Sequence, residues 1–363
     1  MKYLNALNKI QGLGPKNFTV LLNFFETGEN IWKSNLLEIK KSGIGEKLAE
    51  KISREKTQIN PEEELEKLSN ENVRMLSIND NSYPQLLKEI PTAPYILYIK
   101  SDTDNLDFNN TPLISIVGSR KPTQYGIQVA SSIAQKLSQS GMTIVSGMAF
   151  GIDTVAHQST LQNQGDTLAI LGSGLDDKNI GPRSNFQLSR KIINNGALVS
   201  DYPLGVEASR FTFPARNRIM AGMTLGTIVV EATQRSGTLI TANLALDFNR
   251  EVFAVPGSIF SPLSQGPNNL LKLGAKPVTN INDILEELDI KLVKSKEQSR
   301  ETTSLTTTEE LIIKKLTLEP IHIDRISKLT KLEISKVSSI LTILEMRGLI
   351  KNIGGHNYVR TCL

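Results

Sequence analysis

The sequence predicts an α/β fold, a doubly wound and mostly parallel sheet, whose alternating part lies between residues 111 and 290. Short apolar runs typical of strands alternate there with longer helical patterns. Turns rich in Gly and Ser stand between them, as at 117–120, 146–153 and 171–176. Alternation of this length implies right-handed crossovers between parallel strands.

The first sixty residues predict a helical domain at 1–60. Segments 10–18 and 42–52 share one pattern, in which Gly, an apolar residue and Gly precede a helix with basic residues. This pattern resembles a tandem helix-hairpin-helix (SAM-like) domain, whose glycines free backbone amides at a helix start for a phosphate. The alternative is a small helical bundle that binds nothing.

Residues 61–290 are predicted to form the core domain with its lead-in segment. A charged amphipathic helix at 61–73 and a short strand ending at Lys100 come first. The strands expected after them are 113–117, 142–146, 167–171, 197–200, 226–232 and 251–255. The helices expected between them are 125–139, 153–162, 186–195, 215–223 and 238–249.

A flexible linker is predicted at 291–307, because large apolar residues almost disappear there. Residues 308–363 then predict three helices and a β-hairpin, an arrangement that resembles a winged helix. The third helix carries Lys336 and Arg347 beside Glu333 and Glu345. Its polar face is therefore not strongly basic, and a protein contact is as open as reading of a DNA groove.

The totals bound the class of protein. A chain of 363 residues suggests two or three domains, and 39% hydrophobic with 21% charged residues is ordinary for a soluble protein. We expect no membrane helix, no signal peptide and no metal, since the three histidines lie far apart in sequence. The single Cys362 fits a reducing cytoplasm, and a net charge of +4 permits an acidic partner without requiring one.

The candidate site follows from the strand-to-helix turns. In a parallel sheet these turns fall on one edge, where helix amino ends point backbone amides at an anion. The predicted edge also carries four arginines, Arg120, Arg210, Arg216 and Arg218. Phe211 and Phe213 interleave with them, as expected of a platform for single strands. The alternative places both rings in the core and pairs Arg218 with Glu231.

Several familiar catalytic and nucleotide-binding motifs are missing from the sequence. There is no Walker-type phosphate loop, no dinucleotide-binding glycine run and no nucleophile elbow. We assign Asp153 an architectural role, because a carboxylate is a poor neighbour for a phosphate. His157 is expected to pack or cap a helix rather than bind a metal. The pattern favours a protein that holds phosphates without breaking bonds in them.

Six motifs in order closely resemble the DprA/Smf family of DNA-processing proteins over residues 80–285. They are VGSR, SGMAFGIDTVAH, LGSGLD, SDYPLG with FPARNRIMAGM, VVEATQRSGTLITA and REVFAVPG. The resemblance implies an extended Rossmann-like core between the two terminal modules. It also implies a phosphate site at Gly118, Ser119, Arg120, Ser146, Gly147, Phe213, Arg216, Asn217, Arg218, Ser236, Gly237 and Thr238.

One segment departs from the family pattern. After LGSGLD the family usually shows a Tyr-Pro pair, then Asn and often a DNA-contacting Lys, whereas here Pro182 lacks its Tyr. Arg183 is the residue we expect to supply the charge, with Lys178 as an alternative.

The resemblance further implies a cytoplasmic homodimer that binds and protects incoming single-stranded DNA and helps to load the RecA recombinase in natural transformation. No catalytic step and no cofactor are expected. The rival is an enzyme, a nucleotide phosphoribohydrolase like the "lonely guy" family, with Glu231 and an arginine as catalytic residues. This chain lacks the PGG-x-GT-x-x-E run of that family. A pure adaptor with an inert core is a third reading.

Overall fold

The structure, a computed structural model, describes residues 1–103, 106–290, 306–317, 319–347 and 349–360. The chain divides into two compact units, Met1–Val293 and Lys294–Leu363. The predicted linker at 291–307 lies outside the described residues up to 305. Each unit is described by itself below.

The amino-terminal part of the first unit is helical, as predicted. Its elements are α1 (Lys2–Asn8), α2 (Pro15–Phe25), α3 (Gly28–Lys33), α4 (Leu36–Lys41), α5 (Glu46–Glu55), the 3-10 turn η1 (Lys56–Gln58) and α6 (Pro61–Asn70). Both Gly-apolar-Gly turns precede a helix: Gly12 has a φ of +96° before α2, and Gly45 has a φ of +88° before α5. The Asn8 amide donates to the Tyr98 hydroxyl and the Asp201 carbonyl, both at 3.1 Å. Since these bonds join α1 to the core, a separate domain at 1–60 stays a prediction.

The core is a nine-stranded sheet in the order β1-β2-β6-β5-β4-β3-β7-β8-β9. The strands are β1 (Val73–Ser77), β2 (Ile96–Lys100), β3 (Leu113–Val117), β4 (Thr143–Ser146), β5 (Thr167–Ile170), β6 (Gly196–Ser200), β7 (Gly226–Val229), β8 (Glu251–Ala254) and β9 (Lys276–Pro277). The pairs from β6 through β9 are parallel, whereas β1 and β2 add an antiparallel edge. The predicted mostly parallel, doubly wound sheet is confirmed.

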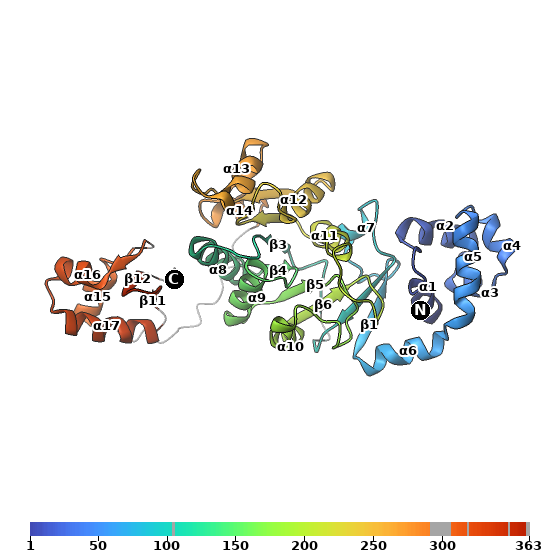
Figure 1. The fold of residues 1–363 in the computed structure, drawn as a ribbon, viewed down its shortest axis with the longest axis horizontal. Coiled ribbons are helices and arrows are strands. Elements are labelled where there is room, and N and C mark those ends of the chain that lie inside the picture. The colour runs from blue at the N-terminus through green and yellow to red at the C-terminus, as the bar shows by residue number, and fades with distance from the viewer. Residues whose placement is uncertain (104–105, 291–305, 318, 348, 361–363) are drawn as a thin grey trace. The chain divides into compact units, whose positions relative to one another are not determined.

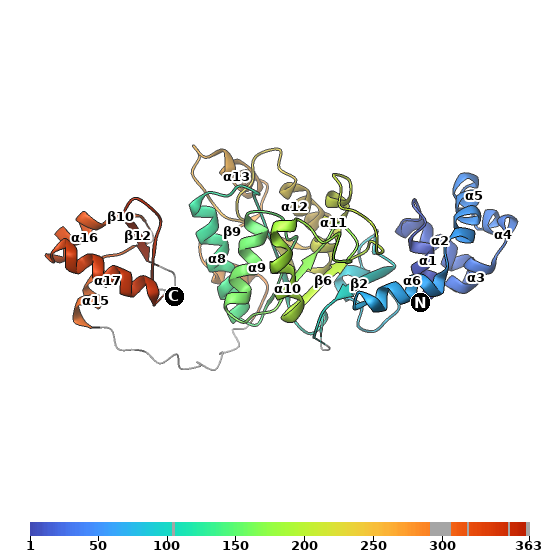
Figure 2. The same ribbon diagram turned by 60° about the horizontal axis from the view of Figure 1, so that its bottom comes forward.

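Helices cover both faces of the sheet (Figures 1 and 2). They are α7 (Gln85–Lys88), α8 (Gln124–Gln139), α9 (Ile152–Gln162), α10 (Phe186–Asn194), α11 (Thr212–Met223), α12 (Thr238–Asp247), α13 (Gln265–Lys272) and α14 (Asn282–Glu287), with 3-10 turns η2 (Arg183–Asn185) and η3 (Pro262–Ser264). Strand β3 shows why both faces are needed. Leu113 and Val117 pack in the cluster that holds α11 and α12, whereas Ile114 and Ile116 pack with α8 and α9. Because successive strand residues point to opposite faces, an apolar strand must be covered twice.

The second unit is a winged helix, as predicted. It contains α15 (Thr307–Ile313), β10 (Ile321–His322), α16 (Ile323–Thr330), α17 (Ile334–Met346), β11 (Ile350–Asn352) and β12 (Asn357–Arg360). The strands pair antiparallel in the order β10-β12-β11. Gly354 and Gly355 have φ values of +99° and +57°, so the two glycines make the turn of the wing.

Within the described ranges, no helix combines the length and the apolar character needed to cross a bilayer.

Candidate nucleic-acid interface

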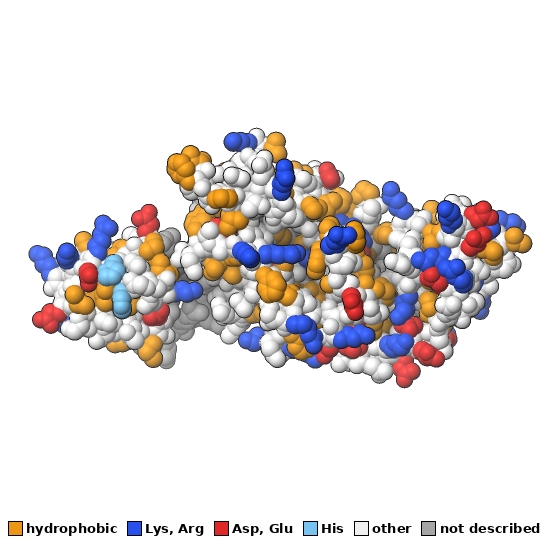
Figure 3. All heavy atoms as spheres, in the orientation of Figure 1, with side chains coloured by type: hydrophobic (Ala, Val, Ile, Leu, Met, Phe, Trp, Pro, Cys, Tyr) orange, Lys and Arg blue, Asp and Glu red, His pale blue; other side chains and the backbone are white. Residues whose placement is uncertain are grey.

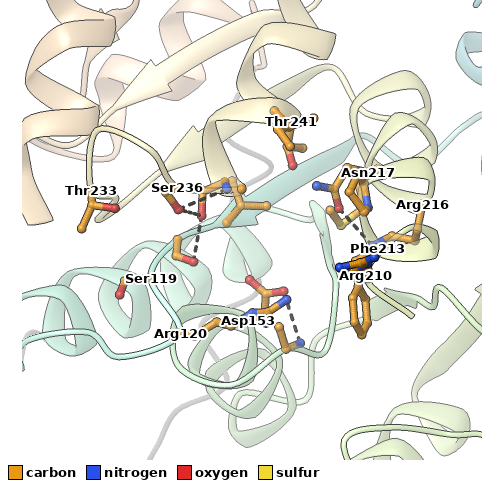
Figure 4. A pocket seen from close by; sticks show the side chains of 18 of the residues that line it. Ser119, Arg120, Asp153, Arg210, Phe213, Arg216, Asn217, Thr233, Ser236 and Thr241 are labelled. Atoms are coloured by element: carbon orange, nitrogen blue, oxygen red, sulfur yellow. Dashed lines mark hydrogen bonds between the residues drawn. The ribbon is translucent and has the colours of Figure 1, made fainter. Parts of the chain in front are cut away.

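A cavity of about 540 Å³ lies where the winding of the sheet reverses. Strand β3 has β4 on one side and β7 on the other, so the chain runs outward from β3 through β6 and then returns to β7. The lining residues fall within 117–120, 149–153, 210–220 and 233–241, with Leu263 from a further loop (Figure 4). Such a switch point at the carboxyl ends of parallel strands is where open α/β sheets bind ligands. Figure 3 shows Lys and Arg side chains over this part of the sheet, where Figure 1 places β3 and α11.

The turn after β3 supplies one wall of the cavity through Gly118, Ser119 and Arg120. A Cβ on Gly118 would lie 2.6 Å from Cγ1 of Ile152, so packing against α9 already requires glycine there. Arg120 is exposed, and its guanidinium carbon lies 5.4 Å from the centre of the Phe213 ring. Among the residues that the structure describes, no carboxylate oxygen lies within 4 Å of the Arg120 side-chain nitrogens. Arg120 is therefore a cation whose charge is not used within the core.

The turn after β4 contributes Ala149 and Asp153 to the lining of the cavity. The Ser146 hydroxyl is buried and donates to the Ile116 carbonyl at 2.7 Å. The Asp153 carboxylate accepts from the amides of Gly147 (3.1 Å) and Ala149 (3.3 Å), which confirms its architectural role. Burial raises the pKa of Asp153, and the positive charge of Arg216 opposes that shift. Ser146 and Gly147 thus support the loop, whereas Ala149 and Asp153 line the cavity.

Helix α11 supplies a second wall and the floor. Arg216 is 4% exposed and donates to the carbonyls of Gly147 (2.8 Å) and Ile170. Burial lowers its pKa to about 10, so Arg216 still carries its charge at neutral pH. Asn217 accepts from Nε of Arg216 at 3.2 Å, and Phe213 lies half-buried beneath Arg120. Arg216 therefore ties the ends of β4 and β5 together while it lines the cavity.

The turn after β7 closes the ring of segments. The Thr238 hydroxyl donates to the Gly118 carbonyl at 3.1 Å and so joins the two sides of the switch point. The Ser236 hydroxyl donates to the Thr238 hydroxyl at 3.0 Å and accepts from the Thr238 amide at 3.2 Å. Gly237 precedes the first residue of α12 and is exposed. An anion at this end of α12 would meet backbone amides and hydroxyls.

Four of the predicted site residues do not line the cavity, namely Ser146, Gly147, Arg183 and Arg218. Arg218 does not join the other arginines, because it forms an ion pair with the largely buried Asp201 and donates to the Thr92 carbonyl. Its alternative pairing with Glu231 is also wrong. Arg183 lies outside the cavity lining, where it donates to the Asp177 carbonyl at 2.7 Å.

Glu231 does not have the position of a catalytic residue, which the alternative of a phosphoribohydrolase requires. Its carboxylate accepts from the amide (2.9 Å) and the hydroxyl (2.5 Å) of Thr123, the residue that caps α8. It is 2% exposed and is not among the residues that line the cavity. Glu231 therefore anchors a helix rather than facing a ligand.

The sequence analysis did not predict two hydroxyl residues that line the cavity. Thr233 and Thr241 line the cavity, and Thr241 lies three residues after Thr238 on the same side of α12. That i, i+3 spacing was the available signal. The alternative that places both Phe211 and Phe213 in the core is wrong, since Phe211 is 72% exposed and Phe213 is half-buried.

His157 is buried on α9, as the packing role predicted. Its Nδ1 lies 2.7 Å from the Thr167 hydroxyl. Burial lowers its pKa to about 3, so the ring is neutral at ordinary pH.

A doubly wound sheet with a cavity lined by arginines and amides at its switch point defines an α/β protein that is built to bind an anionic ligand. The family model for DNA recombination-mediator protein A matches residues 74–289, and the DprA winged helix domain matches residues 296–356. The chain belongs to the DNA recombination-mediator protein A family, and the predicted resemblance to DprA/Smf is confirmed.

One relative matches nearly the whole chain, and two solved structures match a part of it. Protein Smf of Synechocystis is 36% identical over 99% of this chain and 98% of its own. The crystal structure of DprA from Streptococcus pneumoniae is 38% identical, with a TM-score of 0.68 over 79% of this chain and 98% of that one. DprA from Helicobacter pylori, whose structure was described for its single-stranded DNA binding mode, is 29% identical, with a TM-score of 0.54 over 60% of this chain and 97% of that one.

Proposed function

We propose that the switch-point cavity binds single-stranded DNA through its sugar–phosphate backbone. The observation that carries the proposal is the meeting of exposed Arg120 and Arg210 with the amide- and hydroxyl-rich end of α12 in one cavity. Within the described chain, neither guanidinium has a carboxylate oxygen within 4 Å. The single-strand binding described for the Helicobacter pylori relative supports this choice of ligand. Arginines, hydroxyls and amides contact phosphates without reading bases, so little base preference is expected.

We infer that Arg183 extends this path beyond the cavity. The buried Asn185 donates to the Met148 carbonyl at 2.9 Å, which fixes the segment of Arg183 beside the loop that lines the cavity. The Arg183 and Arg190 guanidinium carbons lie 5.0 and 5.3 Å from the centre of the Phe186 ring. Arg190 is paired with Asp177 at 2.6 Å, whereas Arg183 is exposed and has no carboxylate oxygen within 4 Å in the described chain, so Arg183 is the cation that a phosphate can reach. This supports Arg183 as the replacement for the family's lysine.

The central test uses the full chain in a mobility-shift assay at fixed salt. Arg120→Ala is expected to weaken binding of a single-stranded oligonucleotide by about 1–3 kcal/mol, the range for a charge-assisted contact. Arg74→Ala is the control, because Arg74 is exposed on β1 at the far edge of the sheet. Unchanged affinity in the Arg120 variant would reject the site. Affinity of the unaltered chain should also fall steeply as salt rises, through release of counterions.

The enzyme alternative receives no support from Glu231, since both oxygens of its carboxylate accept bonds from Thr123. We infer that the chain binds DNA without a catalytic step. Incubation with nucleoside monophosphates should release no free base, and any release that Glu231→Gln abolishes would restore the enzyme reading.

Family membership supports the wider proposals as well. We infer that the chain works in the cytoplasm as a homodimer, protects incoming strands from nucleases and helps to load RecA. Sedimentation of the chain with and without an oligonucleotide would test the dimer. Nuclease digestion of a bound strand, followed by RecA filament assembly on it, would test the other two activities. An inert core with active terminal modules, the adaptor reading, predicts that Arg120→Ala leaves all three unchanged.

A further inference from the structure

Two exposed phenylalanines border the cavity. Ala149 and Arg210 both line it, and each is followed directly in the sequence by a phenylalanine, Phe150 and Phe211. Phe150 is 51% exposed and Phe211 is 72% exposed. Exposed aromatic rings beside a groove that binds phosphates are the arrangement on which proteins stack the bases of a single strand.

The Phe211 ring is held in place and remains open on one side. Its amide donates to the Ser209 hydroxyl at 3.2 Å, and the Ser209 amide donates to the Thr212 hydroxyl at 2.8 Å. These bonds fix the backbone at the start of α11. The Arg210 guanidinium carbon lies 4.8 Å from the ring centre, so one face carries a cation and the other is available.

The Phe150 ring is presented by a rigid loop. Gly151 has a φ of +77°, and a Cβ there would lie 2.3 Å from the Ser119 carbonyl oxygen. On the other side, the Asp153 carboxylate holds the amides of Gly147 and Ala149. The backbone is thus held on both sides of Phe150, and the side chain is half exposed.

Phe213 shows what a ring committed to another task looks like. It lines the cavity, is half-buried and lies beneath Arg120. Its ring supports a phosphate-binding cation. Phe150 has no such task among the described contacts, and Phe211, which carries Arg210 on one face, is still 72% exposed.

We propose that Phe150 and Phe211 are stacking faces for two unpaired nucleobases of the strand whose phosphate lies in the cavity. This inference rests on the proposed function and deepens it. Every base has a π-face, so stacking adds affinity without selecting a sequence. In a duplex those faces are covered by neighbouring base pairs. The two rings would therefore make the site selective for single strands, which the phosphate contacts alone do not.

The test replaces each ring by a side chain of similar apolar character. Phe150→Leu and Phe211→Leu are each expected to weaken binding of oligothymidine by at least about threefold, because base–aromatic stacking is lost. Phe24→Leu is the matched control, since Phe24 is 50% exposed on α2, outside the cavity lining. Phe211→Trp, which keeps an aromatic face, should bind oligothymidine at least as tightly as the unaltered chain. Thermal unfolding of each variant checks that the fold is intact.

A strand of abasic sugar–phosphate units separates stacking from phosphate binding. The unaltered chain should bind it as weakly as the double Leu variant binds oligothymidine, and the Leu substitutions should then have no effect. Equal affinity for abasic and base-bearing strands would overturn the stacking faces while Arg120→Ala still confirmed the phosphate site. If the unaltered chain bound neither strand, the proposed function itself would fail.

Discussion

Two pairs of arginines near the switch point differ in what their charges do. Arg120 and Arg210 are exposed, and each lies over an aromatic ring without a carboxylate partner in the described chain. Arg216 and Arg218 lie two residues apart on α11, where the first is buried against carbonyls and the second is paired with Asp201. The first pair is available to a ligand, whereas the second pair is used by the fold.

The difference separates binding from stability within one basic cluster. A buried cation with fixed acceptors cannot leave them without exposing unpaired polar groups, and this is costly. An exposed cation contributes little to the free energy of unfolding, so replacing it costs little stability. Substitutions should therefore affect unfolding at α11 and DNA affinity at the other two positions.

The largest expected effect is on stability. Arg218→Met leaves Asp201 largely buried without its partner, so the free energy of unfolding should fall by about 3–5 kcal/mol. Arg210→Met is the control and should change it by no more than about 0.5 kcal/mol. Urea unfolding followed by circular dichroism measures both. Equal losses in the two variants would remove the distinction between the pairs.

The next effect concerns acid. His157 has a folded-state pKa of about 3, below its unfolded value, because burial disfavours the charged ring. Its contribution to stability is present above pH 6.5 and is lost as pH falls toward 3, by up to about 1.4 kcal/mol per pH unit. His157→Gln should therefore lose less stability than the unaltered chain between pH 7 and 5. Asp153 and Asp201 have raised pKa values and act in the opposite sense, but they are common to both proteins. Parallel stability curves would contradict the prediction.

A smaller effect is expected on DNA affinity when one of the two exposed arginines is replaced. Arg210→Ala should weaken binding of single-stranded DNA by about 1–2 kcal/mol at moderate salt, without a change in unfolding. It should also reduce the slope of log affinity against log salt by about 0.7, the value for one phosphate contact on a single strand. Fluorescence anisotropy across a salt series measures both quantities. A weaker complex with an unchanged slope would mean that Arg210 does not contact a phosphate.

The smallest effect distinguishes two glycines of the site. A Cβ on Gly237 meets no atom within 4 Å, so Gly237→Ala should change the free energy of unfolding by less than about 1 kcal/mol. A Cβ on Gly118 would meet Ile152 at 2.6 Å, so Gly118→Ala should be clearly destabilising. If Gly237→Ala still weakens DNA binding, the ligand approaches the backbone there. Comparable melting temperatures for the two variants would refute the packing argument for Gly118.

The fold could be predicted because its signal is periodic and local. The predicted strand 113–117 and helix 125–139 correspond to β3 and α8 almost residue for residue. Strands β3 to β7 are buried on both faces, and glycine occurs in the turns after β3, β4 and β5, so few alternatives compete. The position of α1 against Tyr98 was not predictable, because a contact between an amide and a hydroxyl ninety residues apart has no sequence pattern.

The site could be predicted only in outline. The turns at 118–120 and 236–238 line one cavity because parallel strands bring their carboxyl ends to one edge. Arg216 and Arg218 looked equivalent in FPARNR, yet two residues on a helix point about 200° apart. Whether a cation meets a carboxylate depends on that direction and on Asp201, which lies at the end of another strand. Sequence spacing alone does not contain the second fact.

The hydrogen bond from the Thr238 hydroxyl to the Gly118 carbonyl has a thermodynamic consequence. It links the turn after β7 to the turn after β3, so these two walls of the cavity are held together before DNA binds. When the binding site is ordered before association, no free energy of binding is lost in ordering it. The entropic penalty of forming the complex then falls on the flexible strand alone.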